Sequence, residues 1–307
     1  MSRFGARMPL PVRTPFRFDF TVAALRRLAA NAVDVVDDDG ATLYRALEDE
    51  SGTAVLAIRQ TGADSIEVRA TGRGARRRLP VAAAMLGTDV DLHEWYARSA
   101  TIEWLRPLAV RLRGLKPPRY PSLWEAGAHA IVFAQISILA AAAIMRRLVE
   151  LLADPVSAGG RIVYPFPGPQ RWLAADESAL RGAGLSHNKV AHIRSAATAF
   201  ADGTLRESAL ESLSTPVAAE ALQSVRGIGP WSAAVMLLRG LGRLDVFPLR
   251  DSGVARSVAL VAGRGVDLDG ALTALGPTRG MLYFHLLLGR LVLPNATGAR
   301  PARSKRA

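Results

Sequence analysis

Short segments in which apolar and polar residues alternate occur along the first quarter of the chain. They are Thr42–Leu47, Ala54–Arg59 and Ser65–Ala70, with glycines at positions 40, 52, 62 and 72 around them. Alternation with turn residues at this regular spacing is typical of antiparallel strands. The pattern therefore predicts a small antiparallel sheet, preceded by a helix at Val22–Val33.

From Val81 onward the apolar residues recur at helical spacing. The predicted helices are Asp91–Arg98, Ile102–Gly114, Leu123–Leu152, Ser178–Leu185, His187–Asp202 and Val217–Val225, with further helices after Pro230. Within them, the apolar stretch Ala126–Met145 is interpreted as one buried core helix, because its polar interruptions disfavour a membrane span. A sheet followed by helices indicates an α+β fold.

These patterns divide the chain into four predicted segments. Residues 1–14 are expected to form a flexible tail, and residues 15–115 an N-terminal α+β sheet domain. The Pro-rich run Lys116-Pro-Pro-Arg-Tyr-Pro is the predicted linker to a helical domain at 116–295. Residues 296–307 are basic and lack large apolar side chains, so they are expected to be a disordered tail.

The segment 217–240 combines two predicted helices with a turn that contains Gly227 and Gly229. Pro230 suits the first position of the second helix, since that position needs no backbone N–H partner. Glycine lets the backbone approach closely, and the free N–H groups at a helix start can bind an anion. Helix, glycine hairpin and helix together predict a phosphate-binding element.

Composition supports a polyanionic partner. The chain has 39 basic and 27 acidic residues, a net charge of +12, and such an excess favours nucleic acid. An arginine-rich coding bias is the alternative. The absence of cysteine excludes disulfides, thiolate nucleophiles and iron–sulfur clusters, and the five histidines show no metal-ligand spacing. With no secretory signal apparent at residues 1–12, we expect a cytoplasmic, nucleoid-associated protein without membrane contact.

The motifs resemble those of a known family. Gly227-Ile-Gly-Pro-Trp-Ser-Ala and Asp245-Val-Phe-Pro-Leu-Arg-Asp resemble the helix-hairpin-helix (HhH-GPD) DNA glycosylase superfamily, and in particular its bacterial 3-methyladenine DNA glycosylase II type. Further similar segments are Phe133-Ala-Gln-Ile-Ser, Phe166-Pro-Gly-Pro-Gln, Leu180-Arg-Gly-Ala-Gly-Leu-Ser and Pro277-Thr-Arg-Gly-Met-Leu-Tyr-Phe-His, so that the resemblance covers about residues 14–293. It implies a two-lobed helical glycosylase body, excision of alkylated purines from double-stranded DNA, a monomeric protein and no required cofactor.

The resemblance gives Asp251 the catalytic role. A carboxylate beneath the sugar stabilises the positive charge that develops as the N-glycosidic bond breaks. Considered by itself, Asp251 also fits a plain helix cap, because Asp is favoured before a helix such as the one predicted after it.

Three residues are implied for the base pocket: Trp231, Val235 and Tyr283. An indole face attracts a cationic alkylated base. Bifunctional members of the superfamily carry a lysine where this chain has Trp231, so we expect no abasic-site lyase activity. Relatives place further aromatic residues where Val235 and the residues after His285 stand, which leaves the base preference open. A core role is the alternative for Trp231 and Tyr283.

The remaining implied residues contact DNA. Gln135 matches the residue that fills the gap left by a flipped nucleotide. The alternative register places Ala134 at this position. In the competing interpretation, Gln135 is a polar residue whose hydrogen bonds are made within the helical bundle. Lys189 is assigned either a backbone phosphate or a solvated helix face. Arg226, Gly227, Ile228 and Gly229 form the implied phosphate-binding hairpin, and the carbonyl groups of Val225 and Ile228 are the implied ligands of a monovalent cation.

Two rival functions stay open at the level of sequence. One is a non-catalytic DNA-binding protein that kept the hairpin, against which the presence of Asp251 argues. The other is a glycosylase for another lesion, such as an oxidised or deaminated base.

Overall fold

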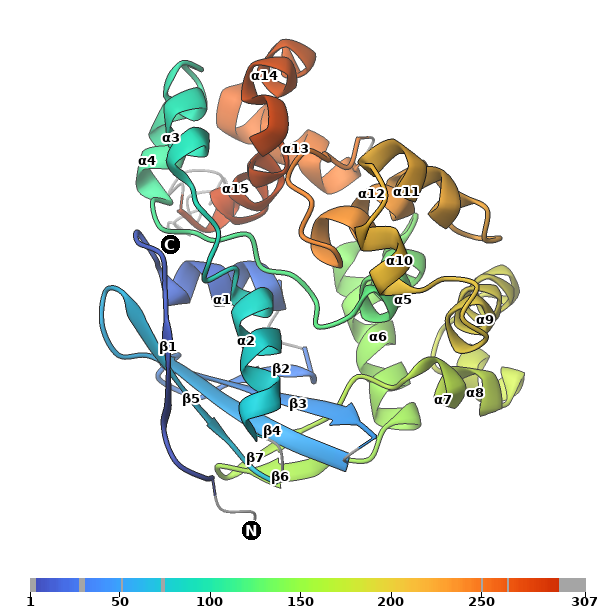
Figure 1. The fold of residues 1–307 in the computed structure, drawn as a ribbon. Coiled ribbons are helices and arrows are strands. Elements are labelled where there is room, and N and C mark those ends of the chain that lie inside the picture. The colour runs from blue at the N-terminus through green and yellow to red at the C-terminus, as the bar shows by residue number, and fades with distance from the viewer. Residues whose placement is uncertain are drawn as a thin grey trace, which may run out of the picture.

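The fold begins with a five-stranded antiparallel sheet. The computed structural model describes residues 4–27, 31–50, 52–72, 75–249, 251–263 and 265–292. The strands are β1 (Met8–Pro11), β2 (Asp34–Val36), β3 (Thr42–Asp49), β4 (Gly52–Gln60) and β5 (Ser65–Ala70), in the order β1-β5-β4-β3-β2 (Figure 1). The three strands predicted from alternation are confirmed. The predicted flexible tail is wrong in part, because β1 pairs with β5 along residues 8–11.

One face of the sheet is covered by two helices, α1 (Phe18–Arg26) and α2 (Leu79–Leu86). The strand alternation explains this packing: in β5 every second residue is buried, and Ile66 and Val68 are fully so. The shared core includes Leu43, Leu56, Ile58, Ile66, Val68, Val22, Leu25, Met85 and Leu86. The helix predicted at Val22–Val33 thus begins and ends earlier, as α1, and residues 28–30 of that prediction lie outside the described residues.

The central helices form one lobe of the helical body. They are α5 (Leu123–Phe133), α6 (Ile138–Leu152), α7 (Pro169–Ala174), α8 (Glu177–Gly182), α9 (His187–Ala201), α10 (Glu207–Glu211), α11 (Thr215–Gln223) and α12 (Pro230–Arg239). Their apolar faces share one core around Trp172, Leu148 and Ile193. Helix α5 lies at its centre and is buried over nearly its whole length.

The second lobe combines helices from both ends of the chain. Helices α3 (His93–Ala100) and α4 (Arg106–Arg111) pack against α14 (Leu268–Leu275) and α15 (Gly280–Val292), and α13 (Ser252–Ala262) completes the lobe. Trp95 and Phe284 are fully buried there. The predicted division at residue 115 therefore does not follow the packing, because the segment 93–111 belongs to the helical body rather than to the sheet (Figure 1).

The apolar stretch Ala126–Met145 is not one buried helix, as predicted, but two helices joined by a turn. Helix α5 ends at Phe133, and the side chain of Ser137 caps α6 by accepting from the backbone N–H of Ala140. Between them Gln135 has a φ of +59°, a left-handed conformation that no helix contains. The first turn of α6 leaves Ile138 and Leu139 exposed. The first half of the stretch is therefore buried in the core of the central lobe, whereas the second half begins at the surface.

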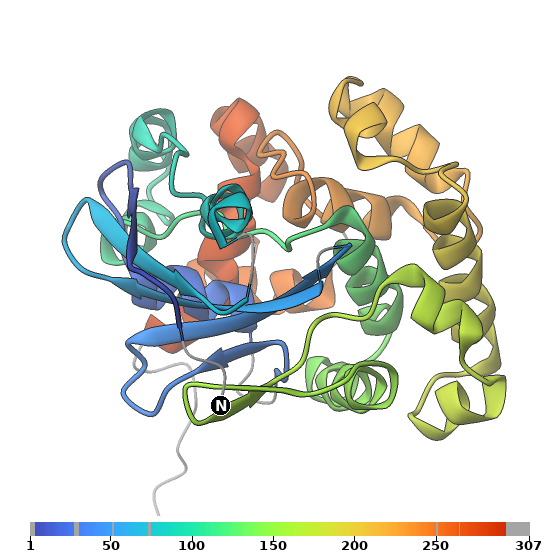
Figure 2. The same cartoon turned by 60° about the horizontal axis from the view of Figure 1, so that its bottom comes forward.

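A short hairpin within the helical region was not predicted. Strands β6 (Val156–Ala158) and β7 (Arg161–Val163) pair with each other and lie beside β2 and β3 (Figure 2). Ala158 and Val163 share a small core with Ala46 and Val55 of the sheet. This hairpin fastens the helical body to the sheet.

A buried ionic cluster makes a second connection. Arg45 of β3 donates to Asp34 at 2.8 Å and to Glu125 at the start of α5, and all three side chains are almost inaccessible. One guanidinium thus serves two carboxylates, one from each part of the fold. Among the described helices, none is long and apolar enough to cross a membrane.

Candidate active site

The hairpin between α11 and α12 has the predicted form. Gly227 adopts a φ of +95°, and a side chain there would collide with the ring of His192. Ile228 donates its backbone N–H to the carbonyl oxygen of Val225 at 3.1 Å, which closes the turn. Gly229 lies in extended backbone at the start of α12 and faces open space. The hairpin therefore leaves the start of α12 accessible to a phosphate group.

The side chains of the hairpin face in different directions. Arg226 is exposed and available to DNA, whereas Ile228 and Val225 have only 4% and 8% of their surfaces exposed. Their side chains anchor the hairpin in the core, so contacts with a partner involve the backbone. The carbonyl oxygen of Val225 keeps one lone pair beyond its hydrogen bond with Ile228, which fits a role as a cation ligand. In the part of the chain that the structure describes, no group of three or more His, Asp or Glu side chains is arranged to hold a metal ion.

Asp251 uses its two carboxylate oxygens for different contacts. Oδ1 accepts from the backbone N–H groups of Gly253 at 2.7 Å and Val254 at 3.0 Å, and so caps α13. Oδ2 accepts from the indole Nε1 of Trp231 at 3.2 Å. The helix-cap interpretation and the catalytic one are therefore compatible, because the cap fixes the carboxylate while leaving Oδ2 directed at Trp231.

Trp231 and Asp251 connect the two lobes. Trp231 is half-buried in the first turn of α12, and its ring packs against the core of the central lobe. Asp251 stands at the start of α13 in the second lobe. Their contact places a partly exposed aromatic ring beside a partly exposed carboxylate.

The other two predicted pocket residues are more enclosed. Val235 has 2% of its surface exposed and packs within the core of the central lobe. Tyr283 of α15 has 3% exposed, and its hydroxyl oxygen accepts from Nη2 of Arg27 at 2.6 Å. Burial raises the pKa of Tyr283 despite the nearby guanidinium groups, so the phenol stays protonated at neutral pH. Neither residue contacts Asp251 through a hydrogen bond.

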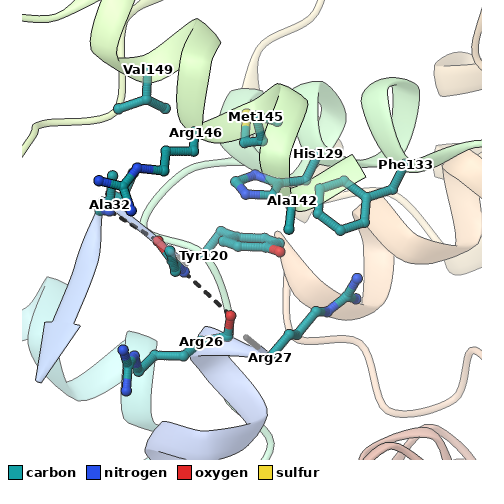
Figure 3. Close-up of a pocket in the computed structure, with 12 residues that line it drawn as sticks. Arg26, Arg27, Ala32, Tyr120, His129, Phe133, Ala142, Met145, Arg146 and Val149 are labelled. Carbon is teal, nitrogen blue, oxygen red and sulfur yellow. Dashed lines mark hydrogen bonds between the residues drawn. The ribbon is translucent and has the colours of Figure 1, made fainter. Parts of the chain in front are cut away.

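A cavity lies between α1, α5 and α6 (Figure 3), and Arg27, which donates to Tyr283, is one of the residues that line it. Arg27, Tyr120, His129, Phe133, Met145 and Arg146 contribute to its lining. The ring of His129 stacks on that of Tyr120, with ring centres 4.4 Å apart. Burial lowers the pKa of His129 to about 3, so this imidazole is neutral at physiological pH. About 30 Å³ is available to the centres of water molecules, room for only a few waters.

Gln135 and Lys189 meet at the turn between α5 and α6. Gln135 is exposed at the tip of the turn, whereas Ala134 is half-buried, and this favours Gln135 over Ala134 as the residue that points outward. The structure gives Lys189 a role that the sequence did not predict. Its ammonium group donates to the carbonyl oxygens of Val132 at 2.6 Å and Ala134 at 2.9 Å, so it supports the turn rather than facing solvent.

Sequence reasoning missed Arg27, Tyr120 and His129. Arg27 follows the last residue of α1, and its guanidinium lies near the rings of Phe133 and Tyr283. No motif marks an arginine at the end of an amphipathic helix. The histidines were noted only for the absence of metal-ligand spacing, which says nothing about stacking.

Known proteins share both the sequence and the fold. The HhH-GPD superfamily of base excision DNA repair proteins matches residues 128–265. The chain is 27% identical over 173 residues to a DNA-3-methyladenine glycosylase of Bacillus subtilis, which covers 56% of this chain and 57% of that protein. It is 26% identical over 234 residues to DNA-3-methyladenine glycosylase 2 of Escherichia coli, covering 76% and 80% of the two chains.

Solved structures agree with these relatives. The 3-methyladenine DNA glycosylase of Archaeoglobus fulgidus superimposes with a TM-score of 0.76 at 25% identity, over 92% of this chain and 97% of that one. The 8-oxoguanine glycosylase/lyase of Clostridium acetobutylicum, in complex with DNA, has a TM-score of 0.73 at 15% identity, covers 95% of this chain and 97% of that one, and shares the fold. Residues 128–265, which match the HhH-GPD superfamily of base excision DNA repair proteins, contain both the hairpin and the Trp231–Asp251 contact.

Proposed function

We propose that this protein is a monofunctional DNA glycosylase that hydrolyses the N-glycosidic bond of alkylated purines of the 3-methyladenine class. The observation that carries the proposal is the Trp231–Asp251 pair, an aromatic face and a carboxylate fixed side by side. Relatives named DNA-3-methyladenine glycosylase support the same substrate class. Its partner in this proposal is double-stranded DNA that contains a damaged base, and it acts as a monomer on the chromosome.

Each group has a separate task in the reaction. The N–H groups at the start of α12 hold a backbone phosphate, and Arg226 adds a positive charge beside them. Gln135 fills the space that the flipped nucleotide leaves in the duplex, which helps to maintain the open state. The face of Trp231 holds the base, and a cationic base gains from the quadrupole of the indole.

Asp251 stabilises the sugar as the bond breaks. Two unit charges about 4 Å apart at an effective dielectric of about 20 interact by roughly 4 kcal/mol. This corresponds to about a thousandfold in rate. Because Oδ1 is occupied by the backbone of α13, Oδ2 is the oxygen that faces the reaction, either toward the sugar or toward the attacking water.

The same residues argue against strand cleavage by this chain. A lyase reaction needs an amine that forms a Schiff base with the sugar, and Trp231 stands where bifunctional relatives carry a lysine. We further propose that a monovalent cation binds the carbonyl oxygens of Val225 and Ile228 and stiffens the hairpin. No organic cofactor enters the proposed reaction.

The test is release of bases from methylated duplex DNA by the wild-type protein and by Asp251→Asn. We expect wild-type protein to release 3-methyladenine and leave abasic sites that break only on later treatment with alkali. Asp251→Asn should retain DNA affinity and lose about a thousandfold in rate.

A matched control is available at the next helix. Asp267 caps α14 by accepting from the backbone of Gly270 at 2.8 Å, as Asp251 caps α13, but has no contact with Trp231 among the described residues. Asp267→Asn should release bases at the wild-type rate. An equal loss in both variants would assign the effect to helix capping, and no release by folded, DNA-binding wild-type protein would reject the alkylated-purine proposal.

A further inference from the structure

The cavity between α1, α5 and α6 is lined by basic and neutral side chains. Arg26 and Arg27 lie at the end of α1 and Arg146 lies on α6, whereas none of the described residues that line the cavity is acidic. The side chain of Arg146 is 53% exposed, so the cavity reaches the surface on this side. Guanidinium groups that converge on a small space without a carboxylate favour an anion there.

Arg27 contributes a guanidinium that lacks a counterion. Its Nη2 donates to the hydroxyl of Tyr283 at 2.6 Å, and its Nε is buried without an acceptor. Among the described residues, no carboxylate forms an ion pair with it, whereas Arg146 is paired with Glu150 at 2.8 Å. Arg27 is therefore the residue of the lining whose positive charge an anion would neutralise.

A second guanidinium of this kind lies beside Tyr120. Arg239 of α12 is fully buried and donates to the carbonyl oxygens of Ala24 and Leu25, both at 3.3 Å. Its guanidinium carbon lies 4.6 Å from the ring centre of Tyr120, which lines the cavity. In the part of the chain that the structure describes, it has no carboxylate partner. A buried charge without a countercharge is costly, and an anion in the cavity would reduce this cost.

Two buried polar side chains of the lining also lack partners. Tyr120 is 3% exposed and His129 is 8% exposed, and their rings stack on each other (Figure 3). Nδ1 of His129 lies 2.9 Å from the carbonyl oxygen of Glu125, so Nδ1 carries the proton and Nε2 is an acceptor. Among the described residues, neither Nε2 nor the Tyr120 hydroxyl has a hydrogen-bond partner. Since buried polar groups are normally paired, these two indicate a polar occupant.

The pKa of His129 reflects the same excess of positive charge. Burial is the largest cause that lowers this pKa to about 3, and the charges of Arg27, Arg239 and Arg45 lower it further. Charges that disfavour a cation at the imidazole favour an anion beside it.

We propose that this cavity binds a phosphate group, held by the charge of Arg27 and by the hydroxyl of Tyr120. Nε2 of His129 accepts from a protonated phosphate oxygen. The space has room for only a few water molecules, which fits inorganic phosphate or the terminal phosphate of a DNA strand. Since α1 belongs to the sheet domain and α5 and α6 to the central lobe, the phosphate connects two parts of the fold. The site is separate from the hairpin between α11 and α12 and does not depend on the proposed glycosylase reaction.

Calorimetric titration of the whole chain with inorganic phosphate, at constant ionic strength, tests this proposal. Arg27→Met removes the unpaired charge, and Tyr120→Phe removes only the hydroxyl. We expect Arg27→Met to weaken phosphate binding by at least about 10-fold and Tyr120→Phe by about 5-fold. Thermal unfolding checks each variant, and Tyr120→Phe remains informative if Arg27→Met does not fold.

Two further arginine variants separate the cavity from other basic surfaces. Arg7→Met removes an exposed arginine of the sheet domain, paired with Glu67 at 3.5 Å, and should leave phosphate affinity unchanged. Arg226→Met removes the exposed charge of the hairpin and should leave the affinity of the cavity unchanged. A titration with an oligonucleotide that carries a 5′-phosphate, compared with the same oligonucleotide without it, tests the end of a DNA strand as the source.

The outcomes are distinct. A loss of affinity for inorganic phosphate in Arg27→Met supports a free anion, and a loss for the phosphorylated oligonucleotide alone supports a strand end. Equal affinities of the wild type, Arg27→Met and Tyr120→Phe for both ligands would overturn the proposal. It would also be overturned if Arg226→Met abolished all phosphate binding, because the hairpin is then the only site, or if the wild type bound neither ligand.

Discussion

The ammonium group of Lys189 lies 2.9 Å from the carbonyl oxygen of Ala134 and connects α9 to the turn that presents Gln135. The same group donates to Val132 at 2.6 Å. Both carbonyl groups belong to the end of α5, where helix geometry leaves carbonyl oxygens without partners. Lys189 therefore acts as a side-chain cap of α5. Gln135, with its left-handed backbone, is the residue directly after this capped end.

We predict that Lys189→Met slows base release by about 10-fold, because charge-assisted hydrogen bonds contribute about 1.5–3 kcal/mol and the turn loses its support. The loss should appear for a lesion in duplex DNA and be much smaller for the same lesion in a single strand, where no stack has to be filled. Release rates on the two substrates provide the measurement. Equal losses on both would show that Lys189 supports the pocket rather than the turn.

The hydrogen bond between Trp231 and Asp251 can be removed without removing the aromatic face. We predict that Trp231→Phe lowers the rate of 3-methyladenine release by about 10-fold, since a hydrogen bond to a charged group contributes about 1.5–3 kcal/mol. Trp231→Ala should cost more, because it also removes the ring. The comparison is made in single-turnover kinetics. A Trp231→Phe variant as slow as Trp231→Ala would mean that the indole N–H contributes everything and the ring nothing.

The two glycines of the hairpin should respond differently to the same substitution. Gly227 has a φ of +95° and no room beside His192, whereas Gly229 has a φ of −89° and open space. We predict that Gly227→Ala weakens DNA binding strongly and lowers the free energy of unfolding by at least about 2 kcal/mol. Gly229→Ala should change the free energy of unfolding little.

Chemical unfolding and a DNA titration measure both effects. Gly229→Ala serves as the matched control for Gly227→Ala, because it adds the same methyl group two residues away. Equal destabilisation by the two substitutions would contradict the geometry of the hairpin described here.

The fold was predictable wherever the local pattern and the tertiary packing agree. Alternation in Ser65–Ala70 gave the correct strand, since one face of the sheet is buried and the other is not. Gly227, Pro230 and the helical spacing after Trp231 gave the hairpin, because turns and helix starts depend on local chemistry. Asp251 was predictable for the same reason, as a cap at a helix start.

Features that depend on distant partners were not predictable. The break at Gln135 is supported by Lys189, which is more than fifty residues away in sequence, and no signal in Ala126–Met145 reveals it. The assignment of α3 to the second lobe depends on its contact with α14, from the other end of the chain. Arg27 is recognised as a residue that lines the cavity only once the fold has brought it beside Tyr283 of α15, which is far away in sequence.

The buried cluster around Arg45 predicts how stability changes with pH. Burial raises the pKa of Glu125 to about 7 from an ordinary value of 4.5, although the charge of Arg45 pulls it downward. The folded state therefore binds this proton more tightly than the unfolded state. Its stabilising contribution is fully present below about pH 4.5 and is lost as the pH rises through about 7.

We predict that Glu125→Gln, which mimics the protonated carboxyl group, flattens this dependence. The free energy of unfolding of the variant should fall less than that of the wild type as the pH rises between about 4.5 and 7. Urea unfolding across this range measures the difference, and Glu150→Gln, at a more exposed carboxylate paired with Arg146, should keep the wild-type slope. An unchanged slope in Glu125→Gln would mean that Glu125 is already ionised in the wild type across this range. In that case Arg45 of the sheet pairs with two charged carboxylates, those of Asp34 and of Glu125 from the helical body.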